Sequence, residues 1–144
     1  MRKQIYTILT SDTTLASLVA GGWWQPHRII GSNIPRTPFG VITHQADLLI
    51  PEADTYTTTG QISVLDLAVY DRARRGTTAS VDYSVIDSIL ERTRTLLHNA
   101  NITDDDWGVC QCVYAGAGGD RYDEGWECIF RVQSWQIVCY RKGV

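Results

Sequence analysis

"GQISVLDLAVYDRARRGTTASVDYSVIDSILERTRTLL", residues 60–97, joins a strand pattern to a helix pattern through a short basic loop. Residues 61–71 are rich in valine, leucine and isoleucine and end at a polar segment, which favours a strand. Ser80 is suited to cap a helix, and Asn99 is suited to end it. Seven apolar side chains fall on one stripe of that helix: Val81, Val85, Ile86, Ile89, Leu90, Leu96 and Leu97. One strand followed by one long amphipathic helix is therefore the centre of the expected fold.

The flanking segments extend this centre into a complete domain. Residues 2–20 have helical spacing, with Ser11 or Asp12 as a cap for a second turn and two glycines after it. A proline-containing connector follows, with a short strand expected around Trp24. Residues 39–50 favour a strand that forms an antiparallel hairpin with residues 61–71.

Two further strands are expected at the C-terminal end, over residues 107–116 and 126–141. The inside–outside alternation of the last strand changes phase near Ser134. Either a β-bulge near Gln133 and Ser134 or a strand covered on both faces would explain the change. The sequence thus predicts one α+β domain spanning residues 1–144. It has a mainly antiparallel sheet of about four to five strands, an N-terminal helix, and the long helix packed on one face.

The uncovered face of this sheet needs either a partner or cover from aromatic side chains. The candidates for that cover are Trp23, Trp24, Trp107 and Trp126. The sequence holds five tryptophans and seven tyrosines, residue types that are enriched at interfaces. An oligomer is therefore expected.

The basic loop over residues 72–80 invites comparison with phosphate-binding loops. It follows a strand, contains one glycine and opens onto a helix, which is the arrangement that holds phosphates in many proteins. It lacks the second glycine and the lysine of a nucleotide-binding loop. An electrostatic contact with another subunit, made by Arg72, Arg74 and Arg75, fits the loop better.

No other cluster of residues indicates catalysis, a cofactor or a metal. The four cysteines are expected to be reduced and mostly buried, because no secretion signal indicates an oxidising compartment. Two of them, Cys110 and Cys112, share one strand face but lack the tight turn of a zinc site. The histidines lie far apart in sequence. The acidic groups read as solvated turns without calcium-loop spacing: Asp104, Asp105, Asp106, Asp120, Asp123 and Glu124.

Charge and hydropathy exclude several classes of protein. The formal net charge is −3, which argues against a protein that binds nucleic acid by coating its phosphates. The apolar runs are shorter than the roughly 20 residues of a membrane helix. The N-terminal segment is interrupted by polar residues and does not form a signal peptide. We expect a protein that works without a membrane.

The layout of the whole chain resembles the tail terminator, or tail completion, proteins of long-tailed bacteriophages. The resemblance rests on the "LASLVAGG" element, the connector "PHRIIGSNIPRTPFGVI", the strand–loop–helix unit of residues 60–97, and the closing "DRYDEGWECIFRVQSWQIVCYR". It covers nearly the full length and rests on the order and spacing of elements rather than on one sharp motif.

The resemblance implies a structural protein of the virion, without enzymatic activity or cofactor. Such proteins form a hexameric ring at the neck-proximal end of the tail. The ring ends polymerisation of the major tail tube protein and offers a docking surface to the head–tail connector or stopper protein. DNA passes through its lumen without sequence-specific binding.

A closed ring joins two different patches of each subunit. Arg72, Arg74 and Arg75 are candidates for one patch, and the six acidic residues named above are candidates for the other. The polar segment over residues 51–60 is expected to be an arm or docking loop. Two alternatives stay open: another neck or head–tail joining protein, and a small cytosolic domain that binds an anion at residues 72–80.

Overall fold

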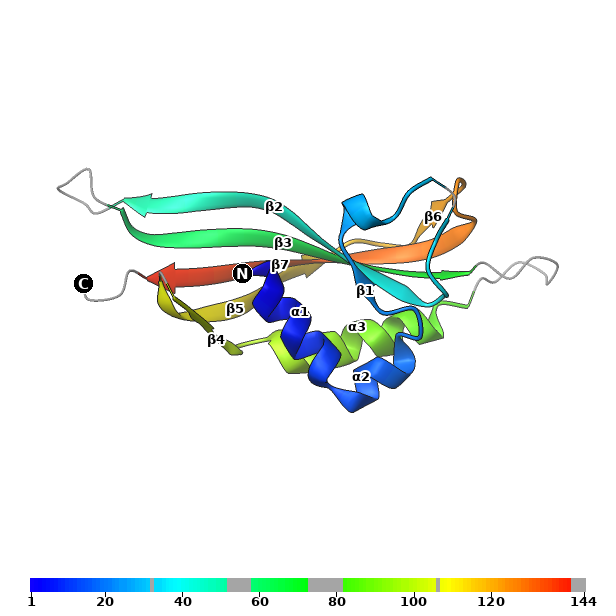
Figure 1. The fold of residues 1–144 in the computed structure, drawn as a ribbon, viewed down its shortest axis with the longest axis horizontal. Coiled ribbons are helices and arrows are strands. Elements are labelled where there is room, and N and C mark those ends of the chain that lie inside the picture. Colours follow the sequence, from blue (N-terminus) through cyan, green and yellow to red (C-terminus); the bar gives the residue numbers. More distant parts are fainter. Residues whose placement is uncertain (32, 52–57, 73–81, 106, 141–144) are drawn as a thin grey trace.

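A curved sheet with helices on one face forms the framework of the protein (Figure 1). The computed structural model describes residues 1–31, 33–51, 58–72, 82–105 and 107–140. The helices are α1 (Arg2–Ser11), α2 (Thr13–Leu18), the short 3-10 helix η1 (Pro26–Arg28) and α3 (Ser84–Leu97). The strands are β1 (Trp23–Trp24), β2 (Phe39–Pro51), β3 (Thr58–Arg72), β4 (Asn101–Asp104), β5 (Gly108–Ala117), β6 (Arg121–Asp123) and β7 (Cys128–Tyr140).

The strands lie in the order β1-β2-β3-β7-β5-β4, and β6 pairs with β7 beyond the end of β5. Every pairing is antiparallel except that of β1 with β2, which is parallel. The α+β class, the hairpin of β2 with β3 and the pairing of β5 with β7 are confirmed. The short strand expected around Trp24 is present as β1. The described sheet has seven strands rather than four to five, because β4 and β6 are too short to produce a clear sequence pattern.

The helices begin and end for local reasons that the sequence largely anticipates. Asp12 caps α2 by accepting a hydrogen bond of 2.7 Å from the backbone N–H of Leu15. At the end of α3, Asn99 adopts a positive φ of 62°, a conformation that asparagine tolerates better than most residues. The described part of α3 begins at Ser84, and the expected cap Ser80 lies outside the described residues.

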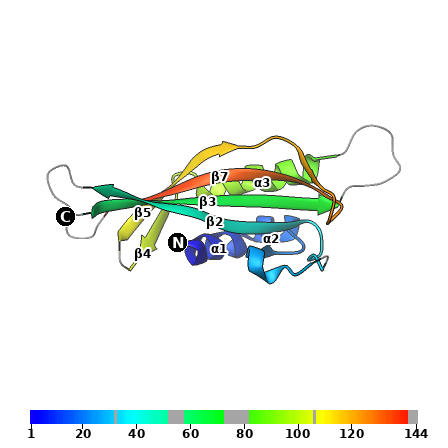
Figure 2. The same cartoon turned by 90° about the horizontal axis from the view of Figure 1, so that it is seen from above.

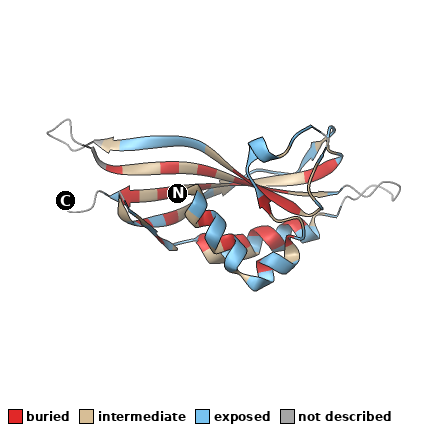
Figure 3. Ribbon diagram, in the orientation of Figure 1, coloured by how far each residue is buried: buried red, intermediate tan, exposed pale blue. Residues whose placement is uncertain are grey.

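The main core lies between the helices and the sheet. Figure 1 shows the three α-helices on the lower side of the sheet; in Figure 2, seen from above, α3 lies behind β7, and α1 and α2 lie on the β2 side. The buried side of α3 consists of Ile86, Ile89, Leu90, Thr93 and Leu97. Val85 is 38% exposed although it was expected on this stripe, because it lies about 100° around the helix from the buried Ile86. Buried residues alternate along β3 and β7, whereas the outer part of β2 is mostly exposed (Figure 3).

The opposite face of the sheet has its own smaller core. Phe39, Val41 and Ala68 are buried there, and the ring of Trp126 packs 5.1 Å from that of Tyr70. Trp126 therefore covers part of this face, as the sequence suggested. Two of the other candidates for cover, Trp23 and Trp107, pack against the main core on the helix side instead, and Trp24 is 37% exposed.

The phase change in β7 arises because both of its faces are covered. Pairing between β3 and β7 runs without interruption through Gln133 and Ser134, so β7 has no bulge towards β3 at that point. The register shift lies in β5, between Tyr114 and Gly116, opposite Ser134. The first of the two expected explanations is thus wrong in its location, and the second is correct.

Candidate assembly surfaces

One end of the sheet carries both basic and acidic candidates. Arg72 is exposed at the end of β3 and pairs across the sheet with Cys128, which is also the register partner of Asp123 in β6. Arg72 and the acidic turn after β5 therefore lie at the same end of one chain. Arg74 and Arg75 lie outside the described residues, as does most of the loop considered for anion binding.

The acidic residues of this turn differ in their contacts. The carboxylate of Asp120 accepts a 2.6 Å hydrogen bond from Nε of Arg131. Asp123 accepts a 2.8 Å hydrogen bond from the backbone N–H of Trp126 and so shapes the turn into β7. Glu124 is exposed. Within this group, Glu124 is the residue best placed to contact another molecule.

Arg131 joins three separate elements at this end, which the sequence did not indicate. It forms ion pairs with Asp120 and with Asp87 of α3, and its guanidinium lies 4.9 Å from the centre of the Tyr83 ring. The hydrogen bond to Asp120 is the largest influence that raises the pKa of Arg131. The signal in the sequence was an arginine within the apolar run that begins the last strand. Its role is to fix the β6 turn against the start of α3.

The second acidic candidate group lies at the other end of the sheet. Asp104 ends β4 and accepts a 3.1 Å hydrogen bond from the backbone N–H of Trp107; Asp105 is exposed. Asp106 lies outside the described residues. Strand β5, which pairs with β4, meets β7 at Cys139, whereas Arg72 pairs with Cys128 at the other end of β7. The acidic group at Asp104 and Asp105 is therefore separated from Arg72 by the length of β7, roughly 36 Å for an extended strand.

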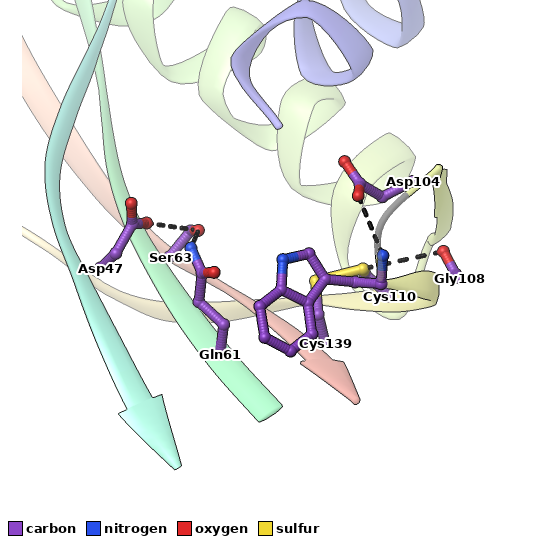
Figure 4. Close-up of a disulfide and its surroundings, with 8 residues drawn as sticks. Asp47, Gln61, Ser63, Asp104, Gly108, Cys110 and Cys139 are labelled. Carbon is purple, nitrogen blue, oxygen red and sulfur yellow. Dashed lines mark hydrogen bonds between the residues drawn. A yellow bond between two sulfur atoms is a disulfide. The ribbon is translucent and has the colours of Figure 1, made fainter. Parts of the chain in front are cut away.

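The cysteines correct one expectation. Cys110 and Cys139 face each other across β5 and β7 and form a disulfide, with Cα atoms 4.3 Å apart (Figure 4). The expectation of four reduced thiols is therefore wrong: only Cys112 and Cys128 are free. The other two cysteines are buried directly opposite one another on paired strands. Burial raises the pKa of Cys112 to about 12 and that of Cys128 to about 11, so neither thiol is a ready nucleophile. Among the described residues, no cluster of three metal-ligating side chains is present.

A polar group near the disulfide contains serine, histidine and aspartate but lacks the order of a hydrolytic triad. Ser63 donates to Asp47 over 2.7 Å, and His44 Nε2 lies 2.9 Å from the same carboxylate (Figure 4 shows Asp47, Ser63 and Gln61). Burial alone would raise the pKa of Asp47, but hydrogen bonds from Ser63, His44 and Gln61 outweigh it and lower that pKa. A triad needs histidine between serine and aspartate, and here aspartate occupies the middle.

A groove of about 560 Å³ lies between α1 and β1. The motif "GGWW" builds it. Gly22 adopts a positive φ of 79°, and its carbonyl accepts a 2.9 Å hydrogen bond from the backbone N–H of Gly40. The ring of Trp23 lies so close over Gly40 that a Cβ there would come within 2.2 Å of the ring. Sequence analysis treated this motif only as a helix end and a short strand.

We call this groove the α1 groove. Its rim is aromatic and basic. Tyr6 is 47% exposed and Trp24 37% exposed. The N–H of the Trp24 ring donates to the carbonyl of Gly21 over 2.7 Å, which fixes the ring at the rim. Three cationic side chains also line it: Arg2, Lys3 and Arg28. Arg2 in addition borders the neighbouring hollow that contains Asp104.

Among the residues that the structure describes, no helix has both the length and the hydropathy needed to cross a bilayer. No protein-family model and no curated protein matches the chain. Among solved structures, a chain of "Virion of native gene transfer agent (GTA) particle" is similar, with a TM-score of 0.69 and 13% identity. The similarity covers 97% of this chain and 94% of that chain. At this identity it shows a common fold, one that is used in a virion particle.

Proposed function

We propose that the chain is a structural virion protein that forms a ring on the end of a phage tail tube. In this role it ends tube polymerisation and offers a docking surface to the head–tail connector, without catalysis. The fold likeness to a chain of a virion particle carries the proposal, because it extends over nearly all of both chains. The likeness of the sequence layout to tail terminators supplies the finer assignment.

The distribution of charge supports a head-to-tail assembly. A closed ring requires that one patch of each subunit fit a different patch of the next. Arg72 lies at one end of the sheet and Asp104 with Asp105 at the other, so neighbouring copies can bring these groups together. Arg74, Arg75 and Asp106 extend the proposed contact on sequence grounds. The turn with Asp120, Asp123 and Glu124 lies beside Arg72 in the same chain and is better suited to another contact.

The proposed partners follow from this position in the virion. One face of the ring meets the last ring of the major tail tube protein, and the other meets the connector or stopper protein. The formal charge of −3 per chain suits a lumen that DNA crosses, because a strongly basic lumen would retain the phosphates. Assembly takes place in the host cytoplasm, and the mature protein resides at the neck-proximal end of the tail.

Electron microscopy of particles made without this gene tests the proposal. Loss of a terminator gives overlong tails, and complementation with the wild-type gene restores their length. Tails of normal length that fail to join heads would favour another neck protein instead. Normal virions would contradict both assignments.

A further inference from the structure

The α1 groove has the properties of a docking site rather than of a structural gap. It combines a volume of about 560 Å³ with two partly exposed aromatic rings, those of Tyr6 and Trp24. Exposed rings beside a concavity offer apolar area that a partner can cover at low entropic cost. The occupant should therefore bring an apolar or aromatic side chain.

The charges of the rim restrict the occupant further. Lys3 and Arg28 are exposed and Arg2 is half-buried. Within the described part of the chain, none of these three cations forms an ion pair with a carboxylate. No acidic residue lines the groove. The occupant should therefore be acidic as well as aromatic.

One surface of the chain itself has this chemistry. Strand β6 carries Tyr122, which is 51% exposed, and ends at Asp123; the exposed Glu124 follows at the start of the turn to β7. We call residues 122–124 the acidic turn. Its carboxylates match the three cations of the α1 groove in sign, and Tyr122 supplies the aromatic ring. Arg131 holds the base of this turn through Asp120, so the turn is presented in a fixed position.

The contact is assigned to two copies of the chain. In the sheet, β6 lies four strand positions from β1, on the order of 19 Å at the usual strand spacing. The connector after η1 reaches the end of the acidic turn, where the ring N–H of Trp126 donates to the carbonyl of Gly31. Within the described part of one chain, however, no ion pair joins the acidic turn to the cations of the groove, so both groups are available to a second copy. A contact between two different patches is heterologous and propagates from copy to copy.

We propose that the α1 groove binds the acidic turn of a second copy of this chain. This inference rests on the proposed function, since it names a contact within the ring. It is also continuous with the contact proposed above: Arg2 borders both the groove and the hollow of Asp104, and the acidic turn lies at the same end as Arg72. The end of one subunit that carries Arg72 and the acidic turn then meets the surface of the next subunit that carries Asp104 and the α1 groove.

A charge exchange tests the inference. Glu124→Lys and Arg28→Glu, each alone, should raise the dissociation constant for self-association at least tenfold, measured by sedimentation velocity of the full chain at constant salt. An equimolar mixture of the two variants should associate more tightly than either alone, because one contact then pairs the introduced lysine with the introduced glutamate. Glu91→Lys, on the exposed side of α3, makes the same charge change outside both surfaces and should leave association unchanged.

The outcomes separate this inference from the proposed function. Rings that form with unchanged affinity in both variants, folded by near-ultraviolet circular dichroism, would overturn the groove contact and leave the ring intact. A wild-type chain that stays monomeric at all concentrations would overturn both. Tyr122→Ala gives an independent check, since loss of the ring should weaken association even at high salt, where the charge effect is screened.

Discussion

Breaking the disulfide between Cys110 and Cys139 should lower the free energy of unfolding by a predictable amount. The two residues are separated by 29 positions in sequence. A crosslink that closes a loop of this length restricts the unfolded chain, and the loop-entropy relation gives about 3.6 kcal/mol at 25 °C. The folded state itself should change little, because both cysteines are buried on strands that β-sheet pairing already holds together.

Urea denaturation with and without a strong reductant measures this difference. A thiol titration in denaturant without reductant should find two thiols, and four after reduction. Cys112→Ser is the control variant: it should keep the same difference between the oxidised and reduced chains, because Cys112 is not part of the crosslink. Four thiols before reduction, or equal stability of the oxidised and reduced chains, would refute the reasoning.

Three further changes test other parts of the structure. Gln133 is 4% exposed and donates one hydrogen bond to the backbone of α3, but its Oε1 has no partner among the described residues. Gln133→Leu should therefore leave the free energy of unfolding unchanged or raise it by about 1 kcal/mol. A lower free energy of unfolding in urea denaturation would show instead that the amide is needed. Gly40→Ala should lower that free energy by about 1–3 kcal/mol, because its Cβ would meet the ring of Trp23; an unchanged melting temperature would contradict the close contact. Asp12 has a pKa below its usual 3.8, chiefly through its hydrogen bond from Arg92, so this stabilisation is present above about pH 4 and is lost as the pH falls through the lowered value. In acid denaturation, Asp12→Asn should show a weaker pH dependence than wild type in that range, and an identical dependence would argue against the pair.

Patterns that depend on neighbours in sequence were largely predictable. The stripe of Ile86, Ile89 and Leu90 fixes which side of α3 faces the sheet, and the apolar runs give β2 and β3. Asp12 and Asn99 mark the ends of helices through side-chain and backbone preferences that act locally. These features follow from short-range physics.

Features that depend on the pairing of distant strands could not be predicted in the same way. The disulfide requires that β5 lie beside β7 in one particular register, which neither segment shows alone. The ion pairs of Arg131 require β7, α3 and the β6 turn to converge. The α1 groove arises where Trp23 packs over Gly40, seventeen positions away in sequence.

The stoichiometry of the purified full-length protein tests the central claim most directly. Mass photometry, together with class averages from negative-stain electron microscopy, gives both the mass and the symmetry of the assembly. A ring of six chains of 16.1 kDa has a mass of about 97 kDa and shows six-fold symmetry with an open centre. A closed two-fold dimer, or a monomer at every concentration tested, would contradict the account.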